Sequence, residues 1–257
     1  AVTTGFGVIN NNAQLKIGQS IVVFGAGGIG LNIIQAAAMV SGHPIIAVDL
    51  FDNKLALAKS LGATHLINSR NVDAEKAVRE LVGKDGADVA VDNTGNVRVI
   101  EMAYRLTSGN GRTVLVGVPP KGSEATIYTL PLHFEKELTG SHGGEARPER
   151  DIPRYVSLCK NGRLKLGELV GKRYRLDEIN EACSLIQKDV DPEATVIFGV
   201  AWDNTLGDAL RVTVIATGIG AKAQLQAVPE TPAPKRRLAT LDEVNAGSHE
   251  YERPPRP

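Results

Sequence analysis

A glycine-rich hexapeptide, Gly25-Ala26-Gly27-Gly28-Ile29-Gly30, constrains the fold of this chain more than any other feature of its sequence. It directly follows the apolar run Ile21–Phe24 and opens an apolar stretch of helical period. A strand, a glycine turn and a helix N-terminus in this order can cradle a phosphate, because free backbone N–H groups and the helix dipole point at one place. We expect Gly25 to permit the turn, Gly27 to admit a pyrophosphate and Gly30 to let helix and strand pack closely.

The first 140 residues alternate short apolar runs with segments of helical period, which is typical of βαβ units around a parallel sheet. The predicted strands are Ser20–Phe24, Pro44–Val48, Thr64–Ile67, Ala87–Val91, Arg112–Gly117 and Glu137–Gly140. The predicted helices are Gly28–Val40, Asp52–Leu61 with Asp52 as N-cap, a third near Asp73–Leu81 and a fourth near Val97–Leu106. The predicted fold class is therefore α/β, with a doubly wound, six-stranded parallel sheet of the Rossmann type.

The end of the second predicted strand indicates the cofactor. Asp49 lies 19 residues after Gly30, where a carboxylate accepts hydrogen bonds from the hydroxyls of an adenosine ribose and repels a 2′-phosphate. NAD is therefore favoured over NADP. Lys54 could reach the same ribose, or it is a surface lysine. Val116-Gly117-Val118 could hold the nicotinamide carboxamide through backbone groups, or it is a plain strand end closed by prolines.

Four regions are predicted along the chain: a Rossmann domain over 1–141, a helical extension over 142–188, a β-hairpin over 189–220 and a disordered tail over 221–257. The extension begins with a polar turn and holds helices near Asp151–Lys160 and over Asp177–Lys188. The hairpin is predicted from Thr195–Ala201 and Ala209–Ala216, which alternate or run β-branched around a polar turn. The tail has much proline and few large apolar side chains, which is typical of disorder.

Composition excludes several partners. Lys plus Arg (29) equals Asp plus Glu (29), so no net positive field favours nucleic acid. No apolar run reaches the ~18 residues that a membrane span needs, and Ala1–Gly5 resembles neither a signal peptide nor a methionine start. We therefore expect a cytoplasmic protein without nucleic-acid or membrane partners, whose first residue marks a cut.

Several motifs together suggest a family. They are Val2-Thr3-Thr4-Gly5-Phe6-Gly7, the segment Val23–Leu31, Ala47-Val48-Asp49 with Lys54, Leu61-Gly62-Ala63-Thr64, and Val116-Gly117-Val118-Pro119. With them, residues 1 to about 188 resemble the C-terminal half of a zinc-type, medium-chain alcohol dehydrogenase, nearest the class that includes glutathione-dependent formaldehyde dehydrogenase. The resemblance implies that Asp49 and Lys54 hold the adenosine ribose, that Thr4 borders the nicotinamide, and that Val116 and Val118 bind its carboxamide. The candidate cofactor-binding residues are Thr4, Gly25, Gly27, Gly28, Ile29, Gly30, Asp49, Lys54, Thr94, Val116, Gly117 and Val118.

The resemblance also implies a catalytic zinc ion, which polarises the alcohol while hydride passes to the nicotinamide. In that family one cysteine ligand lies immediately before the position of Ala1, and the others come from an upstream domain. The five histidines of this chain form no pair at metal-ligand spacing. We therefore assign no catalytic and no metal-binding residue here. An acidic residue within Lys188–Glu193 stands near a pyrophosphate-binding arginine of the family, so weakened NAD binding is expected.

The segment from Asp191 to Gly218 resembles the end of the bacterial division protein FtsZ, without that family's GTP loop or catalytic acidic loop. Four hypotheses stay open: an NAD(H)-binding half-enzyme that is inactive alone; the same half paired with a separate catalytic domain that oxidises a primary alcohol; a non-enzymatic interaction protein; and a frame that fuses two truncated genes. We favour the first. A homodimer joined near Arg112–Pro120 and Ser123–Pro131 is the expected assembly.

Overall fold

The structure is a computed structural model, which describes residues 1–170, 174–175, 197–200, 209–210 and 212–215 of the chain. The predicted helix over Asp177–Lys188 and the predicted tail over 221–257 lie outside these residues. Within the described ranges, no helix is both long and apolar enough to cross a bilayer.

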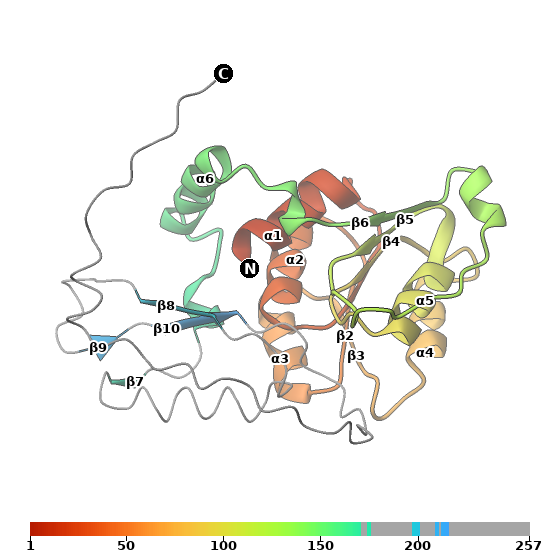
Figure 1. The fold of residues 1–257 in the computed structure, drawn as a ribbon, viewed down its shortest axis with the longest axis horizontal. Helices are drawn as coiled ribbons and strands as arrows, with labels where there is room; N and C mark the ends of the chain where they lie inside the picture. Colours follow the sequence, from red (N-terminus) through yellow and green to blue (C-terminus); the bar gives the residue numbers. More distant parts are fainter. Residues whose placement is uncertain (171–173, 176–196, 201–208, 211, 216–257) are drawn as a thin grey trace, which may run out of the picture. The chain divides into compact units, whose positions relative to one another are not determined.

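Strands β1 to β6 form a six-stranded sheet in the order β3-β2-β1-β4-β5-β6 (Figure 1), and every neighbouring pair in it is parallel. The strands are β1 (Ile21–Phe24), β2 (Ile45–Asp49), β3 (His65–Asn68), β4 (Ala87–Asp92), β5 (Thr107–Leu115) and β6 (Glu137–Gly140). The first half of the chain winds outward from β1 in one direction and the second half in the other, which is the doubly wound arrangement. The predicted fold class is therefore confirmed.

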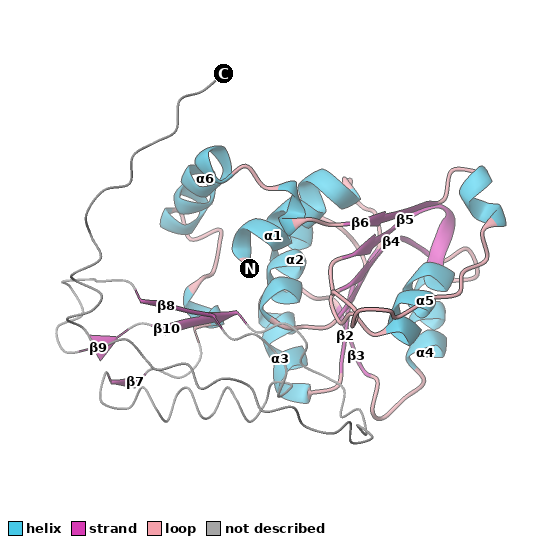
Figure 2. Cartoon of the chain, viewed as in Figure 1, coloured by secondary structure: helices cyan, strands magenta, loops and turns pink. Residues whose placement is uncertain are grey.

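Helices cover both faces of this sheet (Figure 2). The helices among the described residues are α1 (Val2–Gly7), α2 (Gly28–Met39), α3 (Asp52–Ser60), α4 (Ala74–Val82), α5 (Val97–Leu106) and α6 (Pro148–Lys160), with short helical turns η1 (Val8–Ala13), η2 (Leu130–His133), η3 (Gly143–Glu145) and η4 (Gly167–Leu169). Successive side chains of β1 point to opposite faces. Ile21 and Val23 join the apolar cluster with α2 and α3, whereas Val22 and Phe24 join the cluster with α4 and α5.

Two local predictions need correction. The fifth strand starts at Thr107, not at Arg112, because Ser108–Gly111 runs as strand through a shift in register, with Ala87 opposite Thr107 and Val89 opposite Arg112. It also ends two residues before Gly117. Asp52 is the first residue of α3 and not its N-cap, which is Phe51.

The N-terminal helix α1, which the sequence did not predict, packs directly on α2. A Cβ atom added to Gly5 would lie 2.5 Å from Asn32 Cβ, so the two helices touch at the backbone. The ring of Phe6 lies 5.0 Å from that of Tyr155 on α6, which brings the described start of the 142–188 region against the same core. The boundary at residue 141 stays a prediction.

Short antiparallel ladders lie in the region of the predicted hairpin. Strand β8 (Ile197–Val200) pairs with β10 (Val212–Ile215), as the alternating pattern predicts. The second predicted strand is nevertheless divided, because β9 (Ala209–Leu210) pairs with β7 (Tyr174–Arg175) instead.

Candidate functional site

The candidate cofactor residues gather at the carboxyl edge of the sheet, where β1 and β4 lie side by side and the direction of winding reverses. Ligands of open α/β sheets bind at this switch point, because the connections leave a crevice there. The glycine loop follows β1, Asp49 ends β2, Thr94 follows β4, and Val116 to Val118 follow β5.

The glycine loop has the geometry that its sequence predicts. Gly25 adopts φ +90°, which side chains disfavour, and a Cβ on Gly30 would lie 1.9 Å from the Gly25 carbonyl oxygen. A Cβ on Gly27 would meet nothing within 4 Å, so the approach to this residue is open. Gly27 is the N-cap of α2 and carries no side chain to cap its first N–H groups. These groups and the helix dipole can therefore receive a pyrophosphate.

Asp49 ties this loop to the end of β2. Its Oδ2 accepts a hydrogen bond from Ala26 N at 2.7 Å, and its Oδ1 accepts from Leu50 N at 2.7 Å and from Phe51 N at 3.0 Å. The residue is only 9% exposed. A carboxylate has about four acceptor positions, so one remains for a ligand hydroxyl. Asp49 is thus a structural anchor, a role that the sequence alone did not indicate, as well as a candidate ligand-binding residue.

Two cations lie over an exposed aromatic ring beside Asp49. The Nζ atom of Lys54 lies 4.9 Å from the centre of the Phe51 ring, and the guanidinium carbon of Arg70 lies 4.4 Å from it. Lys54 was predicted as a candidate, whereas Phe51 and Arg70 were missed. The proximity of Phe51 could have been inferred from its position two residues after Asp49, but that of Arg70 depends on the pairing of β2 with β3.

The turn after β4 is built around a second buried carboxylate. Asp92, which is 0% exposed, accepts hydrogen bonds from Thr94 N, Thr94 Oγ1 and Gly95 N at 3.0, 2.6 and 3.0 Å. Burial raises the pKa of the Asp92 carboxyl above its ordinary value, and these hydrogen bonds oppose part of that rise. The Thr94 hydroxyl proton is therefore committed to Asp92, while its methyl group faces Gly25. Sequence reasoning missed Asp92 because the predicted strand ended at Val91.

The remaining candidates lie around the same edge. Helix α1, which carries Thr4, begins beside the glycine loop, because a Cβ on Gly28 would lie 3.8 Å from Ala1 Cβ. Ile29 packs partly into the core, so its contribution to a ligand would be through its backbone. Val116 N and Gly117 N donate to the Asp92 carbonyl at 2.8 and 2.9 Å, and Val118 is 79% exposed.

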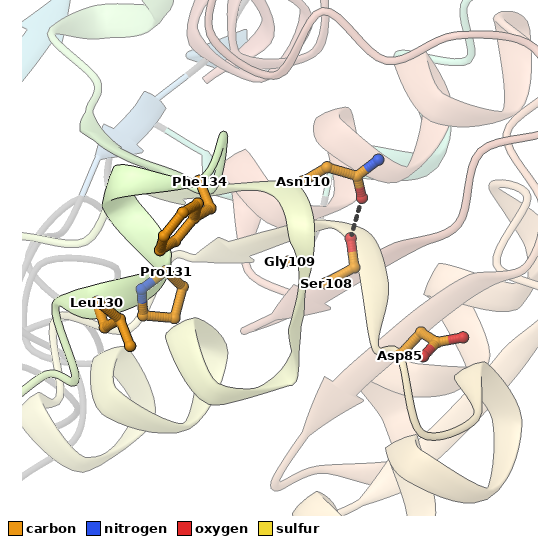
Figure 3. A pocket seen from close by; sticks show the side chains of 7 residues that line it. All are labelled: Asp85, Ser108, Gly109, Asn110, Leu130, Pro131 and Phe134. Carbon is orange, nitrogen blue, oxygen red and sulfur yellow. Dashed lines mark hydrogen bonds between the residues drawn. The ribbon is translucent and has the colours of Figure 1, made fainter.

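An open groove lies at the opposite, amino-terminal edge of the sheet (Figure 3). Its lining residues are Asp85, Ser108, Gly109, Asn110, Leu130, Pro131 and Phe134. Apart from the Ser108–Asn110 hydrogen bond of 3.2 Å, it shows no convergence of polar groups. It holds none of the candidate cofactor residues.

Zinc does not fit the described residues. No three side chains among His, Cys, Asp and Glu come together in the described ranges in a way that could hold a metal ion. His142 instead forms the N-cap of η3, where its backbone N–H donates to Glu145 Oε1 at 3.0 Å.

Comparison with known proteins finds dehydrogenases among the relatives of this chain. The S-(hydroxymethyl)glutathione dehydrogenase of Paracoccus denitrificans is 34% identical over 206 residues, which cover 77% of this chain and 54% of that enzyme. The NDMA-dependent alcohol dehydrogenase of Amycolatopsis methanolica is 38% identical over 184 residues, which cover 70% of this chain and 49% of the relative. The chain thus spans about half the length of these curated relatives.

Solved structures give the same result. An alcohol dehydrogenase zinc-binding domain protein from Burkholderia ambifaria superposes with a TM-score of 0.68 at 35% identity, over 73% of this chain and 50% of that one. Benzyl alcohol dehydrogenase from Acinetobacter calcoaceticus superposes with a TM-score of 0.67 at 34% identity, over 73% and 51%.

Two family models match the chain. The C-terminal domain of the FtsZ family matches residues 168–220, most of which lie outside the described residues. The model described as zinc-binding dehydrogenase matches residues 28–161 and so takes in α2, Asp49, Asp92 and the end of β5. Because that match covers more than half of the 257 residues, the chain belongs to the zinc-binding dehydrogenase family.

Proposed function

We propose that this chain binds NAD(H) as the cofactor-binding part of an alcohol dehydrogenase-type oxidoreductase. One observation carries the proposal: the Asp49 carboxylate bonds to Ala26 N at 2.7 Å and so joins a ribose-binding acceptor to an open glycine cradle at the N-terminus of α2. The likeness to S-(hydroxymethyl)glutathione and alcohol dehydrogenases supports it.

The residues fit a dinucleotide in a definite orientation. The pyrophosphate lies over Gly27 at the start of α2, and the free acceptor position of Asp49 takes a hydroxyl of the adenosine ribose. Its negative charge disfavours a 2′-phosphate, so NAD(H) is preferred to NADP(H). Lys54 adds a cation beside the ribose, and the nicotinamide lies toward Thr4 and the backbone of Val116 to Val118. When bound, the nicotinamide accepts or donates the hydride.

The catalytic metal chemistry of the relatives is assigned to no residue described here. We propose that the described residues contribute cofactor binding, and not metal chemistry, to the oxidation of a primary alcohol.

Calorimetric titration with NAD+ and NADP+ tests the cofactor proposal. Gly27→Val is the informative variant, because its Cβ meets nothing within 4 Å in the free protein but fills the approach of the pyrophosphate. Gly109→Val is the matched control, since its Cβ also meets nothing within 4 Å and it lies at the opposite edge of the sheet. We expect NAD+ to bind the wild type and Gly109→Val but not Gly27→Val, with both variants folded by far-UV circular dichroism. Absence of NAD+ binding to the wild type refutes the proposal.

We propose that the assembly is a homodimer joined near Arg112–Pro120 and Ser123–Pro131. Large apolar side chains are exposed there, with Val118 79% and Tyr128 67% accessible. Tyr128→Asp should shift the protein to monomer in light scattering, whereas Ile17→Asp, at an isolated side chain that is 84% exposed, should not. A monomeric wild type at high concentration refutes the dimer.

We also propose that the FtsZ-like segment is a structural hairpin without nucleotide chemistry. The antiparallel register of β8 and β10 supports this, with Val212 opposite Val200 and Ile215 opposite Ile197. GTP should neither bind nor be hydrolysed in the presence of Mg²⁺, and GTP turnover by the purified chain would overturn the assignment.

A further inference from the structure

A carboxylate that no solvent reaches lies beneath the candidate cofactor site. Asp92 ends β4, is 0% exposed, and accepts three hydrogen bonds from the two residues Thr94 and Gly95. Its ladder neighbours are Phe24 on β1 and Leu115 on β5, and neither is ionisable. The negative charge of Asp92 is therefore stabilised by the donors of the following turn rather than by a cation.

That turn, residues 93–96, fills the space between the two halves of the site. A Cβ on Gly25 would lie 3.2 Å from Thr94 Cγ2, so the turn touches the glycine loop. A Cβ on Gly117 would lie 2.1 Å from Gly95 N, so the turn also touches the exit of β5. Because neither contact leaves free space, a displacement of the turn shifts both surfaces on which a dinucleotide would lie.

Asp92 fixes this turn through both its side chain and its backbone. The Thr94 hydroxyl that donates to the carboxylate also accepts from Asn96 N at 3.1 Å, and Asn96 is the N-cap of α5. The Asp92 carbonyl meanwhile accepts from Val116 N and Gly117 N. A single residue thus holds the start of α5, the turn and the end of β5 in one arrangement.

We infer that Asp92 is a positioning residue for the dinucleotide, which must stay ionised to hold the 93–96 turn between the glycine loop and the β5 exit. The inference rests on the proposed function. Ionisation matters because three donors converge on the two oxygens, and an amide or a protonated carboxyl presents a donor to one of them. Burial raises the pKa of Asp92, so this loss sets in at a higher pH than for an exposed aspartate.

Calorimetry with NAD+ on the full chain tests the inference, with Asp92→Asn as the variant. Asp88→Asn is the matched control, because Asp88 lies at the amino end of the same strand and accepts from Ser20 N and Ser20 Oγ at 2.8 and 2.7 Å. Losing one charge-assisted bond predicts an affinity about tenfold lower for Asp92→Asn. Asp88→Asn should bind NAD+ as the wild type does.

Two further readouts separate positioning from general destabilisation. The affinity of the wild type should fall on acidification toward that of Asp92→Asn, whose own profile should be flatter. Thr94→Val removes the hydroxyl that donates to Asp92 and should weaken NAD+ binding, whereas Thr94→Ser keeps the hydroxyl and should bind NAD+ as the wild type does. This pair tests the inference if Asp92→Asn does not fold. Equal affinity of Asp92→Asn and wild type, or of Thr94→Val and Thr94→Ser, overturns the inference. Absence of NAD+ binding to the wild type overturns the proposed function and the inference with it.

Discussion

Replacing Asp49 by asparagine should lower both the stability of the free protein and its affinity for NAD+. The substitution keeps the size of the side chain but turns one acceptor into a donor. With Oδ1 still accepting from Leu50 N and Phe51 N, the new amide nitrogen faces Ala26 N. Two donors then oppose each other where a hydrogen bond of 2.7 Å existed.

The size of the effect follows from the burial of Ala26. This residue is 1% exposed, so its N–H finds no water in place of the lost acceptor. An unsatisfied buried donor costs about 1–3 kcal/mol of unfolding free energy. In a domain of this size each kcal/mol lowers the melting temperature by about 2–4 °C. The N–H groups of Leu50 and Phe51 belong to exposed residues and add little.

Urea denaturation without ligand and calorimetric titration with NAD+ measure the two effects on the same samples. Asp52→Asn is the matched control: its carboxylate is exposed and, among the residues that the structure describes, accepts only from Asn68 Nδ2 at 2.6 Å, so its unfolding free energy should change by less than about 0.5 kcal/mol. If Asp49→Asn loses affinity but keeps the stability of the wild type, Asp49 does not anchor the glycine loop. If it keeps both, neither role is correct.

Three other substitutions test separate parts of the fold. Gly30→Ala should weaken NAD+ binding at least about tenfold by calorimetry while far-UV circular dichroism stays unchanged, because its Cβ would lie 1.9 Å from the Gly25 carbonyl oxygen; undiminished binding would contradict this. Asp73→Ala removes the N-cap bond to Lys76 N of 3.0 Å and should cost about 1 kcal/mol in urea denaturation, where no change would show that the cap is dispensable. Lys136→Met addresses an amine whose pKa is lowered by burial and then by Arg79, from an ordinary 10.5. Between the lowered pKa of the folded state and the ordinary 10.5, the unfolded state binds more protons than the folded state, so wild-type stability should rise with pH toward 10.5. The variant should lack that slope, and equal slopes in urea denaturation would refute the assignment.

Local patterns were sufficient to predict the sheet and the glycine loop. The run Ile21–Phe24 is apolar on both faces because helices cover both sides of β1, and such runs are readable from sequence. Gly25 and Gly30 were predictable because their requirements are local: Gly25 adopts φ +90°, and a Cβ on Gly30 would lie 1.9 Å from the Gly25 carbonyl oxygen. Thr107 was not recognised as strand because Ser108–Gly111 has the composition of a turn. Only the pairing of β5 with β4 extends the strand back to Thr107.

Long-range contacts account for what the sequence did not reveal at the site. Arg70 reaches the Phe51 ring because β2 and β3 are neighbours in the sheet. In the sequence, 18 residues lie between Phe51 and Arg70. The position of Thr4 depends on α1 packing against α2, where Gly5 meets Asn32 across 27 residues of chain. No local period indicates either contact.

The two buried acids explain why the glycine loop can be both open to a ligand and fixed in shape. A loop that exposes backbone N–H groups to a pyrophosphate cannot use those groups to hold itself, so its conformation must be held from neighbouring strands. Asp49 on β2 does so directly through Ala26 N, and Asp92 on β4 does so through the turn that touches Gly25. Because β2 and β4 flank β1 on either side, the loop is supported from both. Both carboxylates therefore accept most of their hydrogen bonds from the protein's own backbone, and the acceptor position that remains on Asp49 is the one available to a ligand.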